Sequence, residues 1–293
     1  MAQIKLAWQS KLVLLLVLPA VGAGVVLEAH FFTVNLPEVA IWTLGLSVLL
    51  ALVVVKLRAA TPNAALTGAA ITASLMFSTA SIPFHPWETA LVPLLALFVL
   101  SHIATRMGRT QKERSGIAER RHGRSAAQVA ANLGIAALVS QDLVRNWLAD
   151  SGRFGPTFPF PPPLYVIALA ALAEAASDTV SSEIGQVLGG RPRMITTLRH
   201  ADPGTDGAIS LVGTAAGILA AALVAGAGIL ALHGSLVLFW IALVGGLFGL
   251  FFDSLLGATL ERRGWLNNDI VNFLSTAGAA FVAAALLTLR VQP

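Results

Sequence analysis

The sequence predicts an all-α membrane protein that crosses the bilayer several times. Hydrophobic residues make up 56% of the 293 positions and charged residues only 12%, about half the charge density that a soluble surface requires. Mean hydropathy is +0.77. Apolar stretches of about 17 to 26 residues recur along the chain, and each is long enough, or nearly so, to cross a hydrocarbon core of about 30 Å as a helix.

We expect nine spans. The first follows Lys5 and Lys11 but stays apolar as far as Leu27, so we interpret it as a retained span and not as a cleaved signal peptide. Tryptophans fall near the predicted span ends, where interfacial aromatic residues concentrate. The spans lie near residues 11–29, 38–57, 62–80, 87–106, 125–148, 162–178, 207–231, 235–256 and 268–290.

The loops between these spans carry an uneven charge. Sixteen of the 19 Lys and Arg residues fall in one set of loops and three in the other. Because Lys and Arg accumulate on the cytoplasmic side, we expect a cytoplasmic N-terminus, an external C-terminus and a bacterial inner membrane as the location. The pI near 10.1 arises in these short loops, which indicates anionic headgroups or nucleotide phosphates as partners and no nucleic acid.

The polar content divides the chain into two parts. Residues 1–105 hold four spans with few intramembrane charges or amides, and are expected to form a helical membrane scaffold. Residues 106–293 hold five spans whose cytoplasmic loops and helix ends are rich in Arg, Asp, Glu, Asn and Ser. We therefore expect the second part to be the catalytic domain.

A basic loop leads into the fifth span. Arg124, Gln128 and Asn132 follow one another at intervals of four residues, so on a helix they form one polar stripe that runs into the membrane. Such a stripe suits a phosphate headgroup whose tail lies among apolar helices. A loop that only sets orientation would explain the outer arginines, but orientation does not require an amide two turns inside.

Three carboxylates accompany the sixth apolar stretch: Glu174, Asp178 and Glu183. An ionised side chain in hydrocarbon costs about 3 kcal/mol even on the mildest insertion scales, so it persists where it faces a polar cavity, a cation or a partner. The serines and threonines around the three acids add oxygen ligands that suit a hard cation such as Mg2+. The alternative is a polar knot that holds helices together, which rarely needs three acids within ten residues.

The segment after these acids is rich in glycine and arginine. Glycines let backbone N–H groups approach phosphate oxygens, and a helix beginning near Gly207 would direct its N-terminus at the same anion. No Walker pattern is present, and a plain loop with a Pro-Gly turn is the alternative. The candidate nucleotide-binding residues are Arg193, Arg199, Gly204, Thr205, Asp206 and Gly207.

The last two spans carry polar residues inside apolar sequence. Asp253 lies between two glycines at four-residue spacing, so its face is one that neighbouring helices approach closely. A metal ion or its bound water is favoured there over a structural hydrogen bond. Asn268 and Asn272 are four residues apart at the start of the ninth span, beside Asp269. Helix capping would account for Asn267 or Asn268 but not for Asn272.

This inventory suits phosphoryl or nucleotidyl transfer. Metal ions and cations stabilise the charge in such reactions, and little covalent chemistry is required of the protein. The chain has no Cys, which excludes disulfides, thiolate metal sites and cysteine nucleophiles, and no Ser-His-Asp arrangement is evident. The candidate metal ligands, with Mg2+ as the expected ion, are Glu174, Asp178, Glu183, Asp253 and Asp269.

Four sequence blocks resemble those of an uncharacterised integral-membrane family that includes the plant and cyanobacterial phytyl-phosphate kinase and a small animal transmembrane protein. The blocks read SDTVSSEIG, ITTLRHADPGTDGAISLVGT, DSLLGATLE and GWLNNDIVNFLS, and the resemblance covers about residues 106–290. Members of known activity are similar to dolichol kinases and phosphatidate cytidylyltransferases. Two positions depart from the family pattern: Ala208 replaces a second glycine, and Glu261 stands where Gln is common.

The resemblance implies a kinase that transfers a phosphoryl group from a nucleoside triphosphate, with CTP favoured over ATP, to an isoprenoid monophosphate such as phytyl or geranylgeranyl phosphate. The product is a prenyl diphosphate. Asp178, Glu183 and Asp253 would be the catalytic acids, and residues 204–207 would bind the nucleotide. The acceptor-binding candidates are Arg124, Gln128, Asn132, Asn268 and Asn272.

Three alternatives stay open at the level of sequence. A cytidylyltransferase would use the same groups but release pyrophosphate. A lipid or ion transporter would use the intramembrane carboxylates as a relay, but transporters often carry inverted repeats and none is evident here. A purely structural membrane protein is the third. The oligomeric state does not follow from the sequence.

Overall fold

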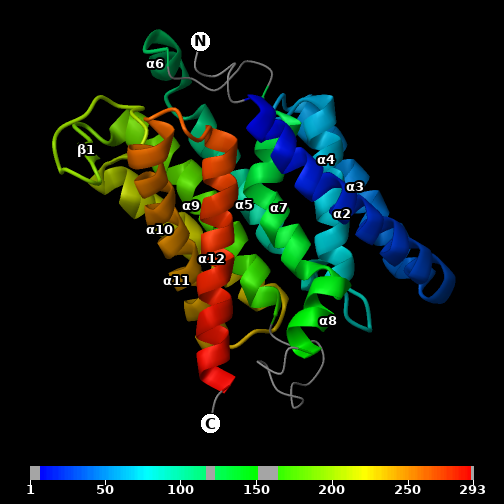
Figure 1. The fold of residues 1–293 in the computed structure, drawn as a ribbon. Coiled ribbons are helices and arrows are strands. Elements are labelled where there is room, and N and C mark those ends of the chain that lie inside the picture. Colours follow the sequence, from blue (N-terminus) through cyan, green and yellow to red (C-terminus); the bar gives the residue numbers. More distant parts are fainter. Residues whose placement is uncertain (1–6, 117–122, 151–163, 292–293) are drawn as a thin grey trace.

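The described part of the chain forms a bundle of helices and one small antiparallel sheet (Figure 1). The computed structural model describes residues 7–116, 123–150 and 164–291. The elements in chain order are α2 (Ala7–Asn35), α3 (Pro37–Lys56), α4 (Pro62–Ser78), η1 (Pro86–Glu88), α5 (Leu91–Arg106), α6 (Arg109–Arg114), α7 (Ala126–Ser140), α8 (Asp142–Asp150), α9 (Tyr165–Leu188), β1 (Arg193–Met194), β2 (Ala208–Ile209), α10 (Leu211–Ala231), α11 (Leu236–Leu256), η2 (Gly257–Glu261) and α12 (Asn268–Val291).

The all-α, multi-pass prediction is confirmed. Within the described ranges, five helices are long and apolar enough to cross a membrane: α2, α3, α10, α11 with its continuation through η2, and α12. The helices α5 and α7 are apolar but shorter. The number of nine spans and the direction of the termini stay predictions.

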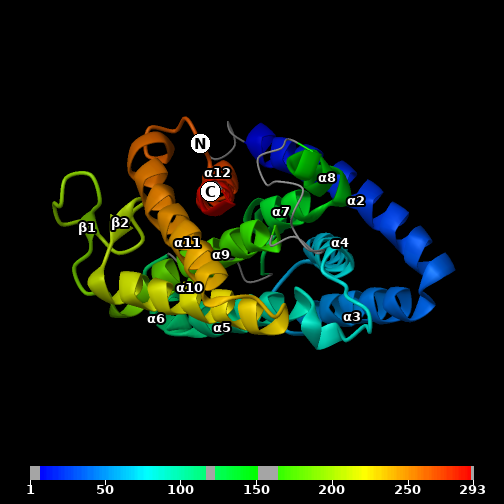
Figure 2. The same ribbon diagram turned by 90° about the horizontal axis from the view of Figure 1, so that it is seen from below.

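Helix α9 is the centre of the bundle. It packs against α5, α7, α10, α11 and α12 (Figures 1 and 2), and every residue from 166 to 177 is buried. A helix surrounded on all sides must be apolar on all sides, which explains why its sequence is a run of Ala, Leu, Val and Ile. The acids on this helix therefore lie in the interior of the protein.

Glycines let two neighbours approach α9 closely. A Cβ atom on Gly217 of α10 would lie 2.8 Å from the Ser177 carbonyl oxygen, and one on Gly246 of α11 would lie 3.0 Å from Ala173 Cβ. Small residues at helix contacts are a common means of packing helices in membranes, where hydrophobic burial cannot drive association. The small-residue content of these spans is thus accounted for by contact with α9.

The helices α2, α3 and α4 form a second group that packs against α7. Helix α5 instead lies against α9 and α10 (Figure 2). The four spans expected within residues 1–105 are therefore divided between two layers, and the last of them belongs to the bundle around α9.

Several helix boundaries differ from the sequence prediction, and three of them bear on the site. The expected span 125–148 is interrupted at Gln141, whose backbone is extended with ψ of 142°, and whose side chain donates to the Ala20 carbonyl at 2.9 Å. The sixth helix continues to Leu188 and so carries all three acids. The next helix begins at Leu211, where Ser210 caps it, and not near Gly207.

The glycine-rich segment between α9 and α10 folds back on itself. Arg193 pairs with Ile209 and Met194 with Ala208, which forms the two-stranded sheet. The Ile195 N–H donates to the Gly207 carbonyl at 3.1 Å, and Gly207 has φ of +74°, a conformation that glycine adopts at low cost. A glycine-rich loop was expected here, and only residues 207–210 fall within the helix expected at 207–231.

Candidate functional site: a polar cavity at one end of the bundle

A cavity of about 300 Å3 lies where α9 and α11 end and α7 and α12 begin. Its walls are mainly polar, and we call it the polar cavity. It brings together twelve of the residues selected from the sequence. They are Arg124, Gln128, Asn132, Asp178, Glu183, Gly204, Thr205, Asp206, Gly207, Asp253, Asn268 and Asn272.

The start of α7 supplies the basic and amide side of the polar cavity. Ser125 caps the helix in a capping box with Gln128, whose Oε1 accepts from the Ser125 N–H at 2.7 Å. Arg124 therefore precedes the helix. Two backbone hydrogen bonds fix its position: the Arg124 N–H donates to Ala59 O, and Arg124 O accepts from the Thr61 N–H, each at 3.0 Å.

Helix α9 supplies the acidic side. Asp178 lines the cavity, and the neighbouring Thr179 hydroxyl accepts a hydrogen bond from Arg124 Nη2 at 3.2 Å. Ser181 and Ser182 follow on the cavity wall. The arginine that precedes α7 and the carboxylate from α9 thus meet at the same wall.

Helices α11 and α12 complete the interior. The Asp178 and Asp253 carboxyl groups both line the cavity, close enough for their charges to repel each other, so a proton or a cation between them lowers the cost of placing both acids there. In the amide orientation that satisfies both of its atoms, Asn272 donates to Asp253 Oδ2 at 3.2 Å and accepts from Asn132 Nδ2 at 3.3 Å. Asn267, and not Asn268, accepts from the Ile270 N–H at 3.0 Å as a helix cap.

The glycine-rich hairpin closes the cavity against the π-helical turn η2. A Cβ atom on Gly257 would lie 2.9 Å from the Gly207 amide nitrogen, so the two backbones are in direct contact. Thr205, beside this contact, donates its hydroxyl to the Asp202 carbonyl at 2.7 Å. Partial burial raises the pKa of the Asp206 carboxyl, and the Arg262 guanidinium acts in the opposite direction.

Four selected residues lie outside the polar cavity. Arg193 is exposed and donates to the Leu198 carbonyl at 2.9 Å, and Arg199 is also exposed. Asp269 accepts from Ser10 Oγ at 2.5 Å, across the contact between α12 and α2. The structure therefore does not bring Arg193, Arg199 or Asp269 to the polar cavity. The fourth residue outside it is Glu174.

Glu174 is buried one turn deeper in α9 than Asp178. Ser275 lies beside it, but the Ser275 hydroxyl donates to the Asn272 carbonyl at 3.0 Å. Neither Glu174 oxygen has a hydrogen-bond partner among the described residues. A buried carboxyl in this state costs least when it is protonated.

A buried lysine was missed by the sequence analysis. Lys112 of α6 forms an ion pair with Glu183 of α9, and its side chain is only 2% exposed. The sequence offers no signal for this contact, because the two residues are 71 positions apart. The positive charge that faces Glu183 in this structure thus comes from the protein itself.

The donor set of the polar cavity suits a magnesium ion that arrives with its substrate. Among the described residues, no group of three or more His, Asp or Glu side chains is arranged to hold a metal ion. Mg2+, however, commonly takes one or two carboxylates and completes its shell with water and substrate phosphates. The facing carboxyls of Asp178 and Asp253 fit that pattern, with the Asn272 amide beside them.

The fold and the polar cavity define a multi-pass helical membrane protein with an acidic, amide-lined chamber at one end. The chain belongs to the integral membrane protein family DUF92, whose model matches residues 45–280. That range takes in every residue that lines the polar cavity.

The chain is similar to several known proteins. An uncharacterized membrane protein of Methanocaldococcus jannaschii is 44% identical over 108 residues, which is 37% of this chain and 45% of that protein. An uncharacterized membrane protein of Synechocystis sp. is 32% identical over 212 residues, 68% of this chain and 74% of that protein. The chloroplastic protein VTE6 of Arabidopsis thaliana is 30% identical over 191 residues, 64% of this chain and 55% of that protein.

The match thus spans about half the length of the archaeal and plant relatives. No solved structure matches the chain. The predicted membership of an integral-membrane family is confirmed, whereas the similarity to dolichol kinases and phosphatidate cytidylyltransferases stays a prediction.

Proposed function

We propose that the protein is a lipid-phosphate kinase that uses Mg2+ and a nucleoside triphosphate, with CTP favoured, to convert an isoprenoid monophosphate into a prenyl diphosphate. The observation that carries the proposal is the polar cavity, in which the Asp178–Asp253 pair, the glycine-rich hairpin and Arg124 face a common space. The resemblance of the sequence blocks to the phytyl-phosphate kinase family supports the choice of substrate.

The reaction requires little covalent chemistry from the chain. An oxygen of the acceptor phosphate attacks the γ-phosphorus, the bond from that phosphorus to the β,γ-bridging oxygen breaks, and the nucleoside diphosphate leaves. A phosphate monoester has its second pKa near 6, so at neutral pH it is mainly a dianion and needs no strong general base. The cavity contains no described histidine on its wall, which agrees with this chemistry.

Each wall of the polar cavity has a role in the proposal. Arg124 holds the acceptor phosphate, since a guanidinium binds phosphate oxygens in a bidentate manner. Backbone N–H groups of residues 204–207 hold the triphosphate. Asp178 and Asp253 hold Mg2+, which would neutralise charge on the transferred phosphoryl group. Asn132 and Asn272 orient Asp253 through the amide chain described above.

The direct test is a product analysis with purified protein, Mg2+, prenyl phosphates and each nucleoside triphosphate, labelled at either the α- or the γ-phosphorus. Transfer of the γ-label to the lipid and release of nucleoside diphosphate support the kinase. Transfer of the α-label with release of pyrophosphate would assign a cytidylyltransferase. Turnover that persists after chelation of divalent cations would contradict the role of Mg2+.

The acidic pair gives the sharpest variant. Asp178→Asn keeps the size of the side chain but removes the charge that binds the cation, and we expect turnover to fall by at least about 100-fold. Glu38→Gln is the matched control, because Glu38 is an exposed acid at the start of α3 and should leave turnover unchanged. Parent-level activity in a folded Asp178→Asn protein would refute the assignment.

A further inference from the structure

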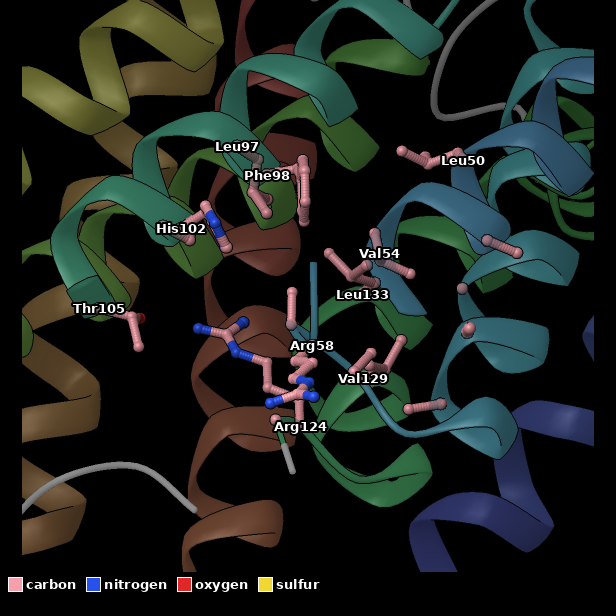
Figure 3. Close-up of a pocket in the computed structure, with 18 of the residues that line it drawn as sticks. Leu50, Val54, Arg58, Leu97, Phe98, His102, Thr105, Arg124, Val129 and Leu133 are labelled. Carbon is pink, nitrogen blue, oxygen red and sulfur yellow. The ribbon is translucent and has the colours of Figure 1, made fainter. Parts of the chain in front are cut away.

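A second cavity, of about 150 Å3, lies between α3, α4, α5 and α7. Its walls are mostly apolar, and we call it the apolar pocket. Leu97 and Phe98 of α5 lie across it from Leu50 and Val54 of α3, with Leu133 of α7 between them (Figure 3). Nothing in the proposed reaction, as described above, uses these residues.

One end of the apolar pocket is strongly cationic. Arg58 and Arg124 lie together there (Figure 3), and Arg106, Arg109 and Lys112 also line it. Most of these cations have partners: Arg106 donates to Leu57 O at 2.9 Å, and Arg109 pairs with Glu113 at 3.0 Å. No carboxylate among the described residues forms an ion pair with Arg58.

The backbone conformation at Arg58 favours glycine over arginine. Arg58 follows the end of α3 with φ of +55°, a left-handed conformation that glycine adopts freely and that costs other residues about 1–2 kcal/mol. A helix end of this kind is usually occupied by glycine. Strain of this sort is commonly retained where the side chain is needed.

The apolar pocket and the polar cavity meet at one residue. Arg124 lines both, held by its backbone bonds to Ala59 and Thr61. Gly123 permits this arrangement, since it has φ of +76° and a Cβ atom there would lie 2.7 Å from the Ala60 amide nitrogen. A group bound by Arg124 is therefore at the boundary of the two spaces.

We propose that the apolar pocket binds the hydrocarbon chain of the acceptor, a single-chain isoprenoid phosphate, with Arg58 and Arg124 on its phosphate. This inference rests on the proposed function and assigns the chain-binding part of the substrate to residues 50–72 and 94–105. Two properties of the pocket identify the occupant. Its apolar walls suit a hydrocarbon chain, and the two guanidinium groups at its end complement the negative charge of a phosphate. The helices α3 and α4 then act in substrate binding and not only as a scaffold.

Two variants separate the chain-binding part from the headgroup part. Gly68→Leu places a side chain into the pocket, where the nearest atom to an added Cβ is Val129 Cγ1 at 3.9 Å. Gly45→Leu is its matched control on α3, because no atom lies within 4 Å of an added Cβ and Gly45 does not line the pocket. Arg58→Gly removes the guanidinium and relieves the left-handed strain, so it is expected to fold.

The experiment is photo-crosslinking of the full chain by a 15- to 20-carbon prenyl monophosphate that carries a diazirine in its chain, without nucleotide. We expect crosslinks in α3, α4 and α5, a loss of at least about tenfold in Gly68→Leu and none in Gly45→Leu. Unlabelled prenyl phosphate should compete, and Arg58→Gly should raise the concentration needed about tenfold or more.

Several outcomes overturn the inference. Crosslinks that map to α10–α12, or full labelling of Gly68→Leu, would exclude the apolar pocket as the chain site. Competition by the corresponding prenol as strong as by the phosphate would exclude the headgroup contact, and equal competition by inorganic phosphate would indicate a site for free phosphate. Because labelling needs no turnover, correct crosslinks without phosphoryl transfer would reject the proposed function and retain the pocket.

Discussion

At the scale of single residues, Lys112 of α6 contacts two other helices, α5 and α9. Besides its ion pair, the Lys112 ammonium donates to the carbonyls of Ala104 at 3.1 Å and Thr105 at 3.3 Å. Both carbonyls belong to the last turn of α5, the negative end of the helix dipole. Lys112 thus ties α5 and α6 to the acidic end of α9.

Removing this lysine should destabilise the fold. Lys112→Met leaves the Glu183 carboxylate, which is only 14% exposed, without its counter-charge, and loss of one member of a buried pair costs about 3–5 kcal/mol. Thermal unfolding in detergent measures the effect. Arg109→Met breaks an exposed pair, with side chains 42% and 40% exposed, and should cost no more than about 1 kcal/mol.

The double variant Lys112→Met/Glu183→Gln tests the reason for the loss. Because it removes the unpaired charge, it should recover much of the stability of the parent. Equal stability of Lys112→Met and the parent would show that the pair contributes nothing to the fold.

Residue-level reasoning from sequence selected twelve of the residues that line the polar cavity but could not tell which acids face it. Asp269 is one position from Asn268, and one step along a helix turns a side chain by about 100°. Asn268 consequently lines the cavity, whereas Asp269 meets Ser10 of α2. Glu174 shares a face with Asp178 but lies one turn deeper, beyond the end of the cavity. Both outcomes depend on where neighbouring helices end.

At the scale of elements, the packing of α9 depends on the absence of side chains on its neighbours. A Cβ atom added to Gly217 of α10 would lie 2.8 Å from the Ser177 carbonyl oxygen and 2.8 Å from Ser181 Cβ. The sequence revealed these helices by their apolar composition. It could not reveal the interruption at Gln141, because no Pro or Gly marks it and a contact with α2 satisfies the Gln141 amide.

A pair of identical substitutions tests this packing. Gly217→Ala should force α10 away from α9 and lower the free energy of unfolding by about 1–3 kcal/mol. Gly22→Ala, at a helical site with no atom within 4 Å of the added Cβ, should be neutral or stabilising by up to about 1 kcal/mol. Denaturation in matched detergent compares the two, and equal effects would contradict close contact as the role of Gly217.

At the scale of the whole molecule, the two ends of the bundle differ in chemistry. Gln9 and Asn267 hydrogen-bond across the start of α2 and the start of α12, so the first and last helices begin at the same end, beside the polar cavity. Helix α12 finishes at the opposite end (Figure 1). This arrangement agrees with the uneven distribution of Lys and Arg, although the number of crossings was predicted from apolar length alone.

Single cysteines can test the orientation cleanly, because the chain has none. Thr197→Cys lies in the exposed hairpin on the side of the polar cavity, and His233→Cys lies between α10 and α11, where the native side chain is 73% exposed. In intact bacterial cells, a membrane-impermeant maleimide should label Cys at 233 and not at 197. Labelling of position 197 alone would invert the predicted topology.

The boundary between the apolar pocket and the polar cavity carries charged side chains, which affects how an anion could pass from one to the other. Arg124 contributes to both chambers, Lys112 borders the apolar pocket and Glu183 borders the polar cavity. An anion crossing a hydrocarbon wall would lose its water without compensation. In the proposed reaction, a phosphate held by Arg124 would remain beside a cation as it approached Asp178 and Asp253, and would not have to cross an apolar wall.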